Sequence, residues 1–435
     1  MRSLAASLRG ASRGFRALRN RNYRLFWFGQ MSSLTGTWMQ DTALPLLVLK
    51  LTNSAFLFSL TVTIRYLPML CMSLFGGVLA DRLPKRSTLI ATQSLQLVVA
   101  LVLAAFTQAD MMTVAVVYVL VATRGAIDAI DMPARQAFTV EMAGPDDLPN
   151  AVALNSAQFN TARIVGPAVA AALLVLPGTM GLLICFYYNA ASFLFVIIAY
   201  LLMRPGEMHA APRPPRQNPL RQLGEGFRYA AKVPDILLVL IILAFMGTFG
   251  FNFQTIIPLL NQYVVHGSKS GLGVLLSLTG IGSVIAGLFA AYGGKPSEKR
   301  LLISAAAFTV ILFLLGVSHW YRVTAVLAFF IGTASIIFMT SANTRLQLSV
   351  TGEMRGRVMG MYSFLFMGTT PIGAILVGVL ASKNGIPLMT MEMAAVCTVG
   401  VLVAVWFALR KRAAAAAATA ATPAAGPPAV GPPES

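Results

Sequence analysis

The sequence predicts an all-α membrane protein whose twelve transmembrane helices form two six-helix bundles. Hydrophobic residues make up 57% of the 435 residues and charged residues only 11%, whereas soluble proteins have about 25% charged residues. Twelve apolar stretches are long enough to cross a hydrocarbon layer about 30 Å thick. Lysine and arginine gather in alternate connections between these stretches, a pattern that an odd number of spans would disrupt.

The apolar stretches lie at 23–50, 54–80, 87–107, 112–133, 150–175, 180–203, 235–262, 270–293, 301–319, 321–344, 356–381 and 386–409. Each is about twice the ten-residue length of a strand in a membrane β-barrel, so we expect helices. The first stretch carries polar side chains, and no small-residue cleavage site follows it. We therefore interpret it as a retained helix and not as a signal peptide.

The chain carries 33 Lys and Arg residues against 15 Asp and Glu residues, a formal net charge of +18. When residues at the ends of spans are counted with the adjoining connection, 26 of these cations fall before the first span, in every second connection or after the last span, and four fall in the other connections. Arg65, Arg124 and Arg163 lie within spans. The positive-inside rule therefore predicts that both termini are cytoplasmic. The cation excess then reflects orientation and contact with anionic membrane lipids, and no nucleic-acid partner is expected.

The distribution of polar residues divides the chain into five segments. They are a basic cytoplasmic N-terminal segment at 1–22, a six-helix bundle at 23–203, a cytoplasmic linker at 204–234, a second six-helix bundle at 235–409 and a disordered cytoplasmic tail at 410–435. The linker places Leu220, Leu223 and Phe227 on one helical face, which predicts a helix lying in the membrane interface. The tail is rich in Ala, Pro and Gly, a composition typical of disorder.

The two bundles resemble each other weakly at an offset of about 210 residues. The run Leu44-Pro45-Leu46-Leu47 in the first span is matched by Ile257-Pro258-Leu259-Leu260 in the seventh. Because each half has six spans, both halves keep the same orientation. Parallel repeats of this kind occur in transporters that bind substrate near the membrane midplane, between the halves.

The fourth span carries four charged residues on one side of its helix. Arg124, Asp128, Asp131 and Arg135 recur at i, i+4, i+7 and i+11, which confines them to a stripe about 60° wide. A charge at the bilayer centre costs at least about 2.5–3.5 kcal/mol, so the stripe must avoid lipid. We expect it to line a wet cavity or a helix interface, and a purely structural ladder of ion pairs is the alternative.

A second polar stripe follows the first span through Gln30, Thr37 and Asp41. Asp41 and Arg65 of the second span lie at similar depths in the membrane. A pair about 4 Å apart gains on the order of 4 kcal/mol at an effective dielectric constant of 20, which offsets much of the cost of burial. Asp41 is then either one end of a fixed bridge or a carboxylate that alternates between pairing with an arginine and carrying a proton.

Further polar side chains lie within the fifth and seventh spans. Together with those of the first span they make a set of candidate cavity-lining residues: Gln30, Thr37, Asn155, Gln158, Arg163, Asn252 and Gln254. Gly166 and Pro167 end the polar part of the fifth span, and small residues there favour close packing of a neighbouring helix.

Enzymatic functions find little support in the sequence. His209, His266 and His319 lie far apart, and the three cysteines are scattered in apolar runs, so neither a metal site nor a disulfide framework is predicted. No phosphate-binding loop ending in Lys-Ser or Lys-Thr is present. We therefore expect no metal or cofactor, and any active transport must draw on an ion gradient.

The connection between the second and third spans resembles the loop signature of the major facilitator superfamily, Gly-x-Leu-Ala-Asp-Arg-x-Gly-Arg-Lys/Arg. Here it reads Gly77-Val78-Leu79-Ala80-Asp81-Arg82-Leu83-Pro84-Lys85-Arg86, with Pro84 in place of the usual glycine. The resemblance implies a cytoplasmic gate between inward- and outward-facing states, formed by Gly77, Asp81, Arg82, Lys85, Arg86 and Arg135. Leu120 and Arg124 resemble the fourth-span motif, whose arginine is implicated in proton coupling, and Gly166-Pro167 resembles the core of the antiporter motif.

A narrower likeness covers residues 20–400 or so. The runs Leu44–Leu49, Thr52–Ala55, Pro133–Phe138 and Arg163–Pro167 resemble the transmembrane secretion effector subfamily, which includes siderophore exporters and macrolide-efflux carriers. The resemblance implies proton-driven export of a bulky amphiphilic small molecule by alternating access, in a bacterial inner membrane and as a monomer. From the charges within the spans, we expect Asp41, Arg65, Arg124, Asp128 and Asp131 to form the proton-coupling site, with protons binding at Asp41 or at Asp128 and Asp131. An importer, or a membrane sensor that transports nothing, are the alternatives.

Overall fold

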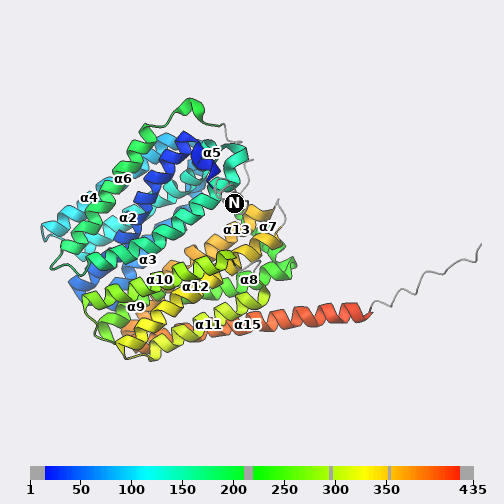
Figure 1. The fold of residues 1–435 in the computed structure, drawn as a ribbon. Coiled ribbons are helices and arrows are strands. Elements are labelled where there is room, and N and C mark those ends of the chain that lie inside the picture. The colour runs from blue at the N-terminus through cyan, green and yellow to red at the C-terminus, as the bar shows by residue number, and fades with distance from the viewer. Residues whose placement is uncertain (1–14, 210–218, 293–296, 351–353, 422–435) are drawn as a thin grey trace, which may run out of the picture.

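The computed structural model describes residues 15–209, 219–292, 297–350 and 354–421. Within these ranges, the side chains of residues 70, 72–82, 219–223, 269–270, 291–292, 355–356, 363, 367 and 414–421 are outside the description. The first half consists of η1 (Arg16–Arg19), α2 (Arg21–Thr52), α3 (Ala55–Arg82), α4 (Lys85–Gln108), α5 (Val114–Leu173) and α6 (Met180–Leu201). Asn20 caps α2, because its side chain accepts hydrogen bonds from the backbone N–H groups of Asn22 and Tyr23. Figure 1 shows α2–α6 gathered into one bundle.

The second half follows a short turn and a linker helix. The elements after α6 are η2 (Pro205–Glu207), α7 (Pro219–Lys232), α8 (Pro234–Phe245), η3 (Met246–Gly250), α9 (Phe253–Tyr263), α10 (Lys269–Tyr292), α11 (Glu298–Val317), α12 (Tyr321–Ser349), α13 (Arg355–Ser363), η5 (Phe364–Gly368), α14 (Thr370–Asn384) and α15 (Ile386–Ala421). The helices from α8 onward form the second bundle in Figure 1. The described residues contain no β-strand.

Among the residues that the structure describes, eight helical segments are long and apolar enough to cross a membrane by themselves. They are Lys85–Gln108, Met180–Leu201, Pro234–Tyr263, Gly271–Ala290, Glu298–Val317, Tyr321–Ser349, Arg357–Asn384 and Ile386–Ala413. The helices α2 and α3 and the two arms of α5 bring the described helical spans to the twelve that the sequence predicts. The α2 helix and the first arm of α5 carry Asp41 and Arg124, so their lower hydropathy reflects the polar site described below.

The fourth and fifth spans are joined without the loop that the sequence suggested between 133 and 150. The α5 helix runs from Val114 to Leu173, and its only non-helical backbone is at Gly144, with φ 72° and ψ 169°. Glycine suits this turn because a positive φ strains other residues, and Pro145 follows at the first turn of the second arm, where a missing N–H is tolerated. The two arms of α5 are therefore longer than the apolar runs that predict the fourth and fifth spans.

The seventh and eleventh spans are each interrupted by one turn of π-helix, η3 and η5. The two interruptions face each other, because a Cβ on Gly247 would come against the backbone of Leu365 and Phe366. Single π turns inside helices frequently mark functional sites. Here they bring Phe251 and Phe366 to the space between the two halves.

The α7 helix lies at the face of the molecule where α2 and α8 begin, which we call the linker face; we call the opposite face the far face. The halves meet near the far face, where α3 packs against α14 and α5 packs against α10. The Tyr263 hydroxyl donates to Asn53 Oδ1 at 3.2 Å, and the Thr63 hydroxyl donates to the Pro371 carbonyl at 3.3 Å. These contacts close the space between the halves at the far face.

The linker contains the expected helix, and α7 places Phe227 on its surface with 55% of the side chain exposed. Its other side packs on α13, where Glu225 and Arg357 form an ion pair at 2.7 Å. The position of this helix in the membrane interface stays a prediction, and the linker residues 210–218 lie outside the described part of the chain.

The C-terminal segment differs from the expected disordered tail, because α15 continues through 410–421. Alanine has the highest helix propensity, and the run that follows Arg412 is almost entirely alanine. The continuation is also fixed by charge: Lys411 Nζ lies 2.6 Å from Asp235 Oδ1, and an Arg412 guanidinium nitrogen lies 2.8 Å from Glu298 Oε1. Residues 422–435 and 1–14 are outside the description.

Candidate functional site

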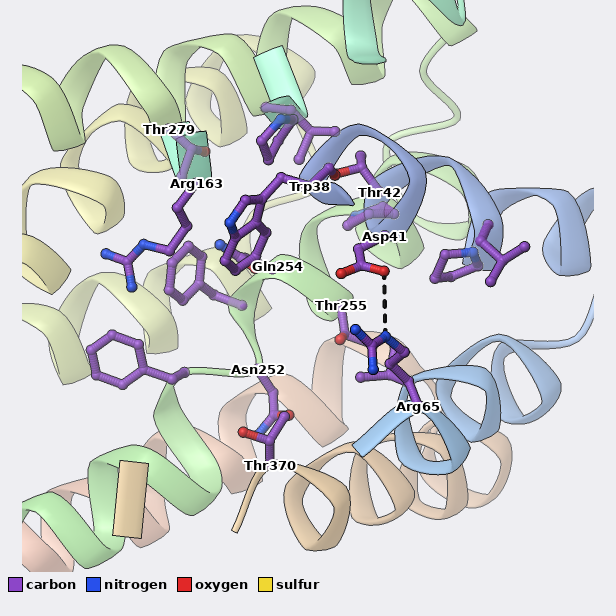
Figure 2. Close-up of a pocket in the computed structure, with 18 of the residues that line it drawn as sticks. Trp38, Asp41, Thr42, Arg65, Arg163, Asn252, Gln254, Thr255, Thr279 and Thr370 are labelled. Carbon is purple, nitrogen blue, oxygen red and sulfur yellow. Dashed lines mark hydrogen bonds and ion pairs between the residues drawn. The ribbon is translucent and has the colours of Figure 1, made fainter. Parts of the chain in front are cut away.

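A cavity of about 200 Å³ lies between the two halves. Its walls come from α2, α3 and α5 of the first half and from α9, the turn that precedes it, α10, α12, η5 and α14 of the second half. Figure 2 shows polar side chains from both halves turned toward this space, with Asp41 and Arg65 on one side and Arg163 on the other. The cavity therefore has the location expected of a binding site between two moving halves.

Asp41 is the centre of a charged network in the cavity wall. Its Oδ1 atom lies 2.6 Å from Arg124 Nη1 and 3.5 Å from Arg65 Nε. Arg65 also pairs with Asp128, at 2.5 Å between Nη2 and Oδ2. The Asp128 carboxylate accepts a further hydrogen bond from Gln96 Nε2 at 2.7 Å. Two arginines and two aspartates, contributed by α2, α3 and α5, thus form one network without net charge.

Close packing of α3 and α5 brings these charges together. A Cβ on Gly125 would lie 2.5 Å from the backbone oxygen of Arg65 and 3.2 Å from the ring of Pro68. Only glycine therefore lets α5 approach α3 at this depth, next to Arg124. The Arg124 side chain is 3% exposed and the Asp41 side chain 16% exposed. Burial at this level makes the pairing of each charge energetically important, because an unpaired buried charge is strongly destabilising.

Asp131 belongs to a separate network nearer the linker face. Its carboxylate lies 2.9 Å from Arg135 Nη2, and it accepts hydrogen bonds from Thr92 Oγ1 at 2.6 Å and from Gln93 Nε2 at 2.9 Å. The Asp131 side chain is 1% exposed and is not among the cavity-lining residues. The charged stripe of the fourth span therefore divides in two. Arg124 and Asp128 pair with Asp41 and Arg65 of the cavity wall, and Asp131 and Arg135 lie in an interface with α4.

The structure places three of the other candidate residues in the cavity wall, namely Arg163, Asn252 and Gln254. Gln30, Thr37, Asn155 and Gln158 were also expected there and lie outside it. Gln158 Nε2 donates to the Trp27 backbone oxygen at 2.5 Å, and Asn155 Oδ1 accepts from the Tyr23 hydroxyl at 2.8 Å. These amides face the interface between α2 and α5. The expectation was wrong for them because polar side chains within one span can point to opposite sides of the helix.

Gly166 holds the second arm of α5 against α2. A Cβ at this position would come against Trp38 Cβ and would lie 2.9 Å from the Thr35 backbone oxygen. Trp38 and Pro167 both line the cavity. The close helix packing expected at Gly166 and Pro167 is therefore present, and it also positions Trp38 and Pro167 in the cavity wall.

The described residues of the predicted gate make contacts within the first half. Arg86 donates from Nε to the Tyr200 carbonyl at 2.9 Å and from Nη2 to the Leu201 carbonyl at 3.1 Å. Lys85 Nζ lies 3.7 Å from Glu141 Oε1. Gly77, Asp81 and Arg82 fall in the part of α3 whose side chains are not described.

Several lining residues were missed from the sequence, above all the aromatic residues Trp38, Tyr66, Phe251 and Phe366. Phe251 and Phe366 meet edge to face with their ring centroids 4.9 Å apart. In an apolar span an aromatic residue looks like ordinary lipid-facing or packing surface, so composition alone does not distinguish it. By contrast Thr92, Gln93 and Gln96 carried a usable signal, because they are polar residues on one part of an apolar span.

The fold and the site can be compared with known proteins. The family model described as transmembrane secretion effector matches residues 12–430. The chain belongs to this family. In the part of the chain that the structure describes, no group of three or more His, Cys, Asp and Glu side chains could hold a metal ion.

Curated relatives of this secretion effector are transporters. The staphyloferrin A transporter of Staphylococcus aureus is 24% identical over 89% of this chain and 96% of that protein. The multidrug efflux pump Tap of Mycolicibacterium fortuitum is 26% identical over 83% of this chain and 90% of that protein. The enterobactin exporter EntS of Escherichia coli is 24% identical, with 83% and 85% covered.

Solved structures establish the fold. The nucleoside transporter NupG covers 90% of this chain and 98% of its own, with a TM-score of 0.64 and 15% identity. A bacterial homologue of the lysosomal transporter Spinster, in an inward-facing and unoccupied conformation, covers 89% and 96% with a TM-score of 0.66 and 15% identity. The secretion effector is therefore a multi-pass bacterial membrane protein with the major facilitator fold, and its family and fold are those of transporters.

Proposed function

We propose that this protein is a proton-driven exporter of a bulky amphiphilic small molecule, a siderophore or a drug, and that it works by alternating access. Relatives named for staphyloferrin A, enterobactin and multidrug efflux support this substrate class. The cavity between the two halves supports alternating access, because each half contributes part of its wall. Two of the relatives are named as an efflux pump and an exporter, which favours outward movement.

The observation that carries the proposed coupling is the position of Asp41. Its carboxylate lies in the cavity wall and contacts Arg124 and Arg65. Protonation of Asp41 removes the charge that Arg124 pairs with and leaves Asp128 as the acid of the network. Breaking a buried ion pair costs about 3–5 kcal/mol, so gain or loss of one proton changes the relative free energies of two arrangements of α2, α3 and α5.

A proton gradient supplies enough energy for this cycle. Each proton that moves inward releases about 2.3 kcal/mol per 100 mV of membrane potential, before the pH gradient is counted. In the proposed cycle Asp41 takes up a proton from the outside and releases it to the cytoplasm. The cycle needs no cofactor other than the gradient, and a monomer contains every residue it uses.

The described conformation is the inward-facing one in this proposal. The excess of Lys and Arg at the linker face supports a cytoplasmic position for that face and for both termini. The contacts of Asn53 with Tyr263 and of Thr63 with Pro371 then close the cavity on the outer side. Export requires these contacts to separate while the cytoplasmic ends of the helices approach each other.

Transport into everted membrane vesicles tests the function and its direction. Vesicles from cells that overproduce the protein are energised with a proton gradient and offered labelled enterobactin, labelled staphyloferrin A or ethidium. We expect accumulation of at least one of these compounds, abolished by a protonophore and absent in vesicles from cells carrying the empty vector. Accumulation that persists when the proton gradient is collapsed would contradict the proposed coupling.

Import is the second candidate, because one relative is named only as a transporter of its siderophore. Right-side-out vesicles distinguish the two directions. Energy-dependent accumulation in right-side-out vesicles alone would establish an importer and overturn export.

A further inference from the structure

We propose that Arg163 recognises an anionic group on the transported molecule, so that the substrate is an anionic aromatic amphiphile. This inference rests on the proposed function in one respect, namely that the cavity between the halves is the substrate site. To the proposed function it adds the chemical class of the ligand and the side chain that binds the charged group of the ligand.

The first argument is the charge balance of the cavity. Arg65 and Arg124 are matched by Asp41 and Asp128 in the network described above. Arg163 lines the same cavity and forms no ion pair with any carboxylate whose side chain the structure describes. The cavity therefore carries one positive charge in excess.

The surroundings of Arg163 do little to stabilise that charge. Its guanidinium Nη1 lies 3.5 Å from the Met339 sulfur, and a thioether is a weak acceptor. Arginine side chains keep their proton in proteins, so the guanidinium of Arg163 stays positively charged. In Figure 2 the guanidinium lies across the Trp38 indole from the Asp41–Arg65 pair. The side chain is thus a charged donor that reaches into the cavity and is left without an anion.

The guanidinium favours one class of ligand group. Its planar fork of N–H donors matches a carboxylate or sulfonate with two parallel hydrogen bonds, which are shorter and stronger than hydrogen bonds between neutral groups. Burial between the two halves strengthens the interaction, because water competes less there. A ligand anion at Arg163 would neutralise the excess charge of the cavity.

The remaining lining explains the aromatic part of the ligand. Trp38 of α2, Tyr66 of α3, Phe251 of the turn before α9 and Phe366 of η5 all border the cavity. Apolar aromatic walls with a few polar groups are typical of small-molecule sites. Asn252 and Gln254 supply hydrogen-bonding groups beside these rings. A ring system between the aromatic residues would place an attached acid at Arg163.

The test is a binding measurement with two probes that differ in one group. The probes are 8-anilino-1-naphthalenesulfonate and N-phenyl-1-naphthylamine, which has the same rings without the sulfonate. Each is titrated by fluorescence into the full-length protein in phospholipid nanodiscs, and the signal of empty nanodiscs is subtracted. The variants are Arg163→Gln, Arg163→Lys and, as a matched control, Arg322→Gln at an exposed position outside the cavity.

We expect Arg163→Gln to raise the Kd of the sulfonate probe by about tenfold or more and to change the Kd of the uncharged probe by less than about twofold. Arg163→Lys should retain most of the sulfonate binding, and Arg322→Gln should bind both probes as the wild type does. An unchanged Kd of the sulfonate probe in Arg163→Gln would overturn the assignment. Equal weakening of both probes would also overturn it, because that result indicates a packing role.

A wild-type experiment keeps the inference testable if Arg163→Gln does not fold. Bound sulfonate probe should be displaced by 2-naphthoate and not by 2-naphthylmethanol at the same concentration. Equal displacement by both compounds would contradict anion recognition. These measurements use no gradient, so their outcome is independent of proton coupling. Absence of charge selectivity in the wild-type protein would refute the inference about Arg163 alone, and failure of transport would refute the proposed function alone.

Discussion

Arg124 and Asp41 lie 83 residues apart in the sequence, and their side chains meet at 2.6 Å between α5 and α2. Asp41 lines the cavity between the two halves, and Arg65 links the pair to Asp128. A substrate in the cavity and a proton on Asp41 would therefore act on the same few side chains. This proximity is the physical basis of the coupling that we propose.

Crosslinking the two halves at the far face should stop transport. A Cβ on Gly273 would lie 3.7 Å from Ala171 Cβ, within the Cβ separation of about 3.5–4.5 Å found in disulfides. The same Cβ would lie 3.0 Å from the Ala171 carbonyl oxygen, so a small local shift is needed. In a Cys71→Ala background, we expect Ala171→Cys with Gly273→Cys to form a disulfide on oxidation and to lose transport.

Reduction of that disulfide should restore transport, and each single cysteine variant should transport in both redox states. The measurement is vesicle uptake before and after dithiothreitol, with disulfide formation checked by thiol labelling. Full transport by the oxidised double variant would show that these helix ends need not separate, which contradicts alternating access through this face.

Replacing Gly166 should destabilise the protein. The methyl group of Gly166→Ala would come against Trp38 Cβ and the backbone of α2, and overpacking of this kind costs about 1–3 kcal/mol. Gly287 is the matched control, because it is also helical and a Cβ there meets nothing within 4 Å. We expect a lower thermal unfolding midpoint for Gly166→Ala and an equal or higher midpoint for Gly287→Ala. Equal midpoints in both variants would contradict the packing role of Gly166.

Asp131 and Arg135 should behave as a structural pair. Asp131→Asn leaves the partly buried Arg135 without its carboxylate, and removal of one partner of a buried pair costs about 3–5 kcal/mol. A double-mutant cycle with Arg135→Gln measures the coupling energy from the free energies of unfolding. Glu207→Gln is a suitable control, because the pair of Glu207 with Arg204 is exposed and pairs of that kind contribute little.

We expect the double variant to be less destabilised than the sum of the two single variants. Additive free energies would mean that the two side chains are not coupled. A folded Asp131→Asn variant of wild-type stability that has lost proton coupling would instead place Asp131 in the transport mechanism.

Hydropathy and charge predicted the twelve spans, because a helix that is surrounded by lipid must consist mostly of apolar residues. The positions of helix ends depend instead on single backbone conformations and on local contacts. Gly144 and Pro145 look like a loop in sequence, yet one residue at φ 72° is enough to join two long helices. The Ala-rich tail looks disordered by composition, yet its first part continues α15 and is held by the ion pairs of Lys411 and Arg412.

The candidate site was predictable where two opposite charges had to pair. Asp41 and Arg65 lie at similar depths, and the structure brings them within 3.5 Å. The stripe from Arg124 to Arg135 was less informative, because eleven residues of helix extend about 16 Å and its two ends contact different helices. Uncharged residues such as Gln158 and Trp38 were not assignable, since their direction depends on how neighbouring helices rotate about their axes.

Proton movement in Asp41→Asn tests the central claim most directly. The protein is reconstituted into liposomes that contain a pH-sensitive dye, and the labelled compound that the wild type transports is added. Asp110→Asn is the matched control, because Asp110 is an exposed acid at φ 52°, where asparagine is also tolerated. We predict that Asp41→Asn exchanges labelled for unlabelled compound but moves no protons, whereas wild type and Asp110→Asn do both. Wild-type proton movement in Asp41→Asn would contradict the account.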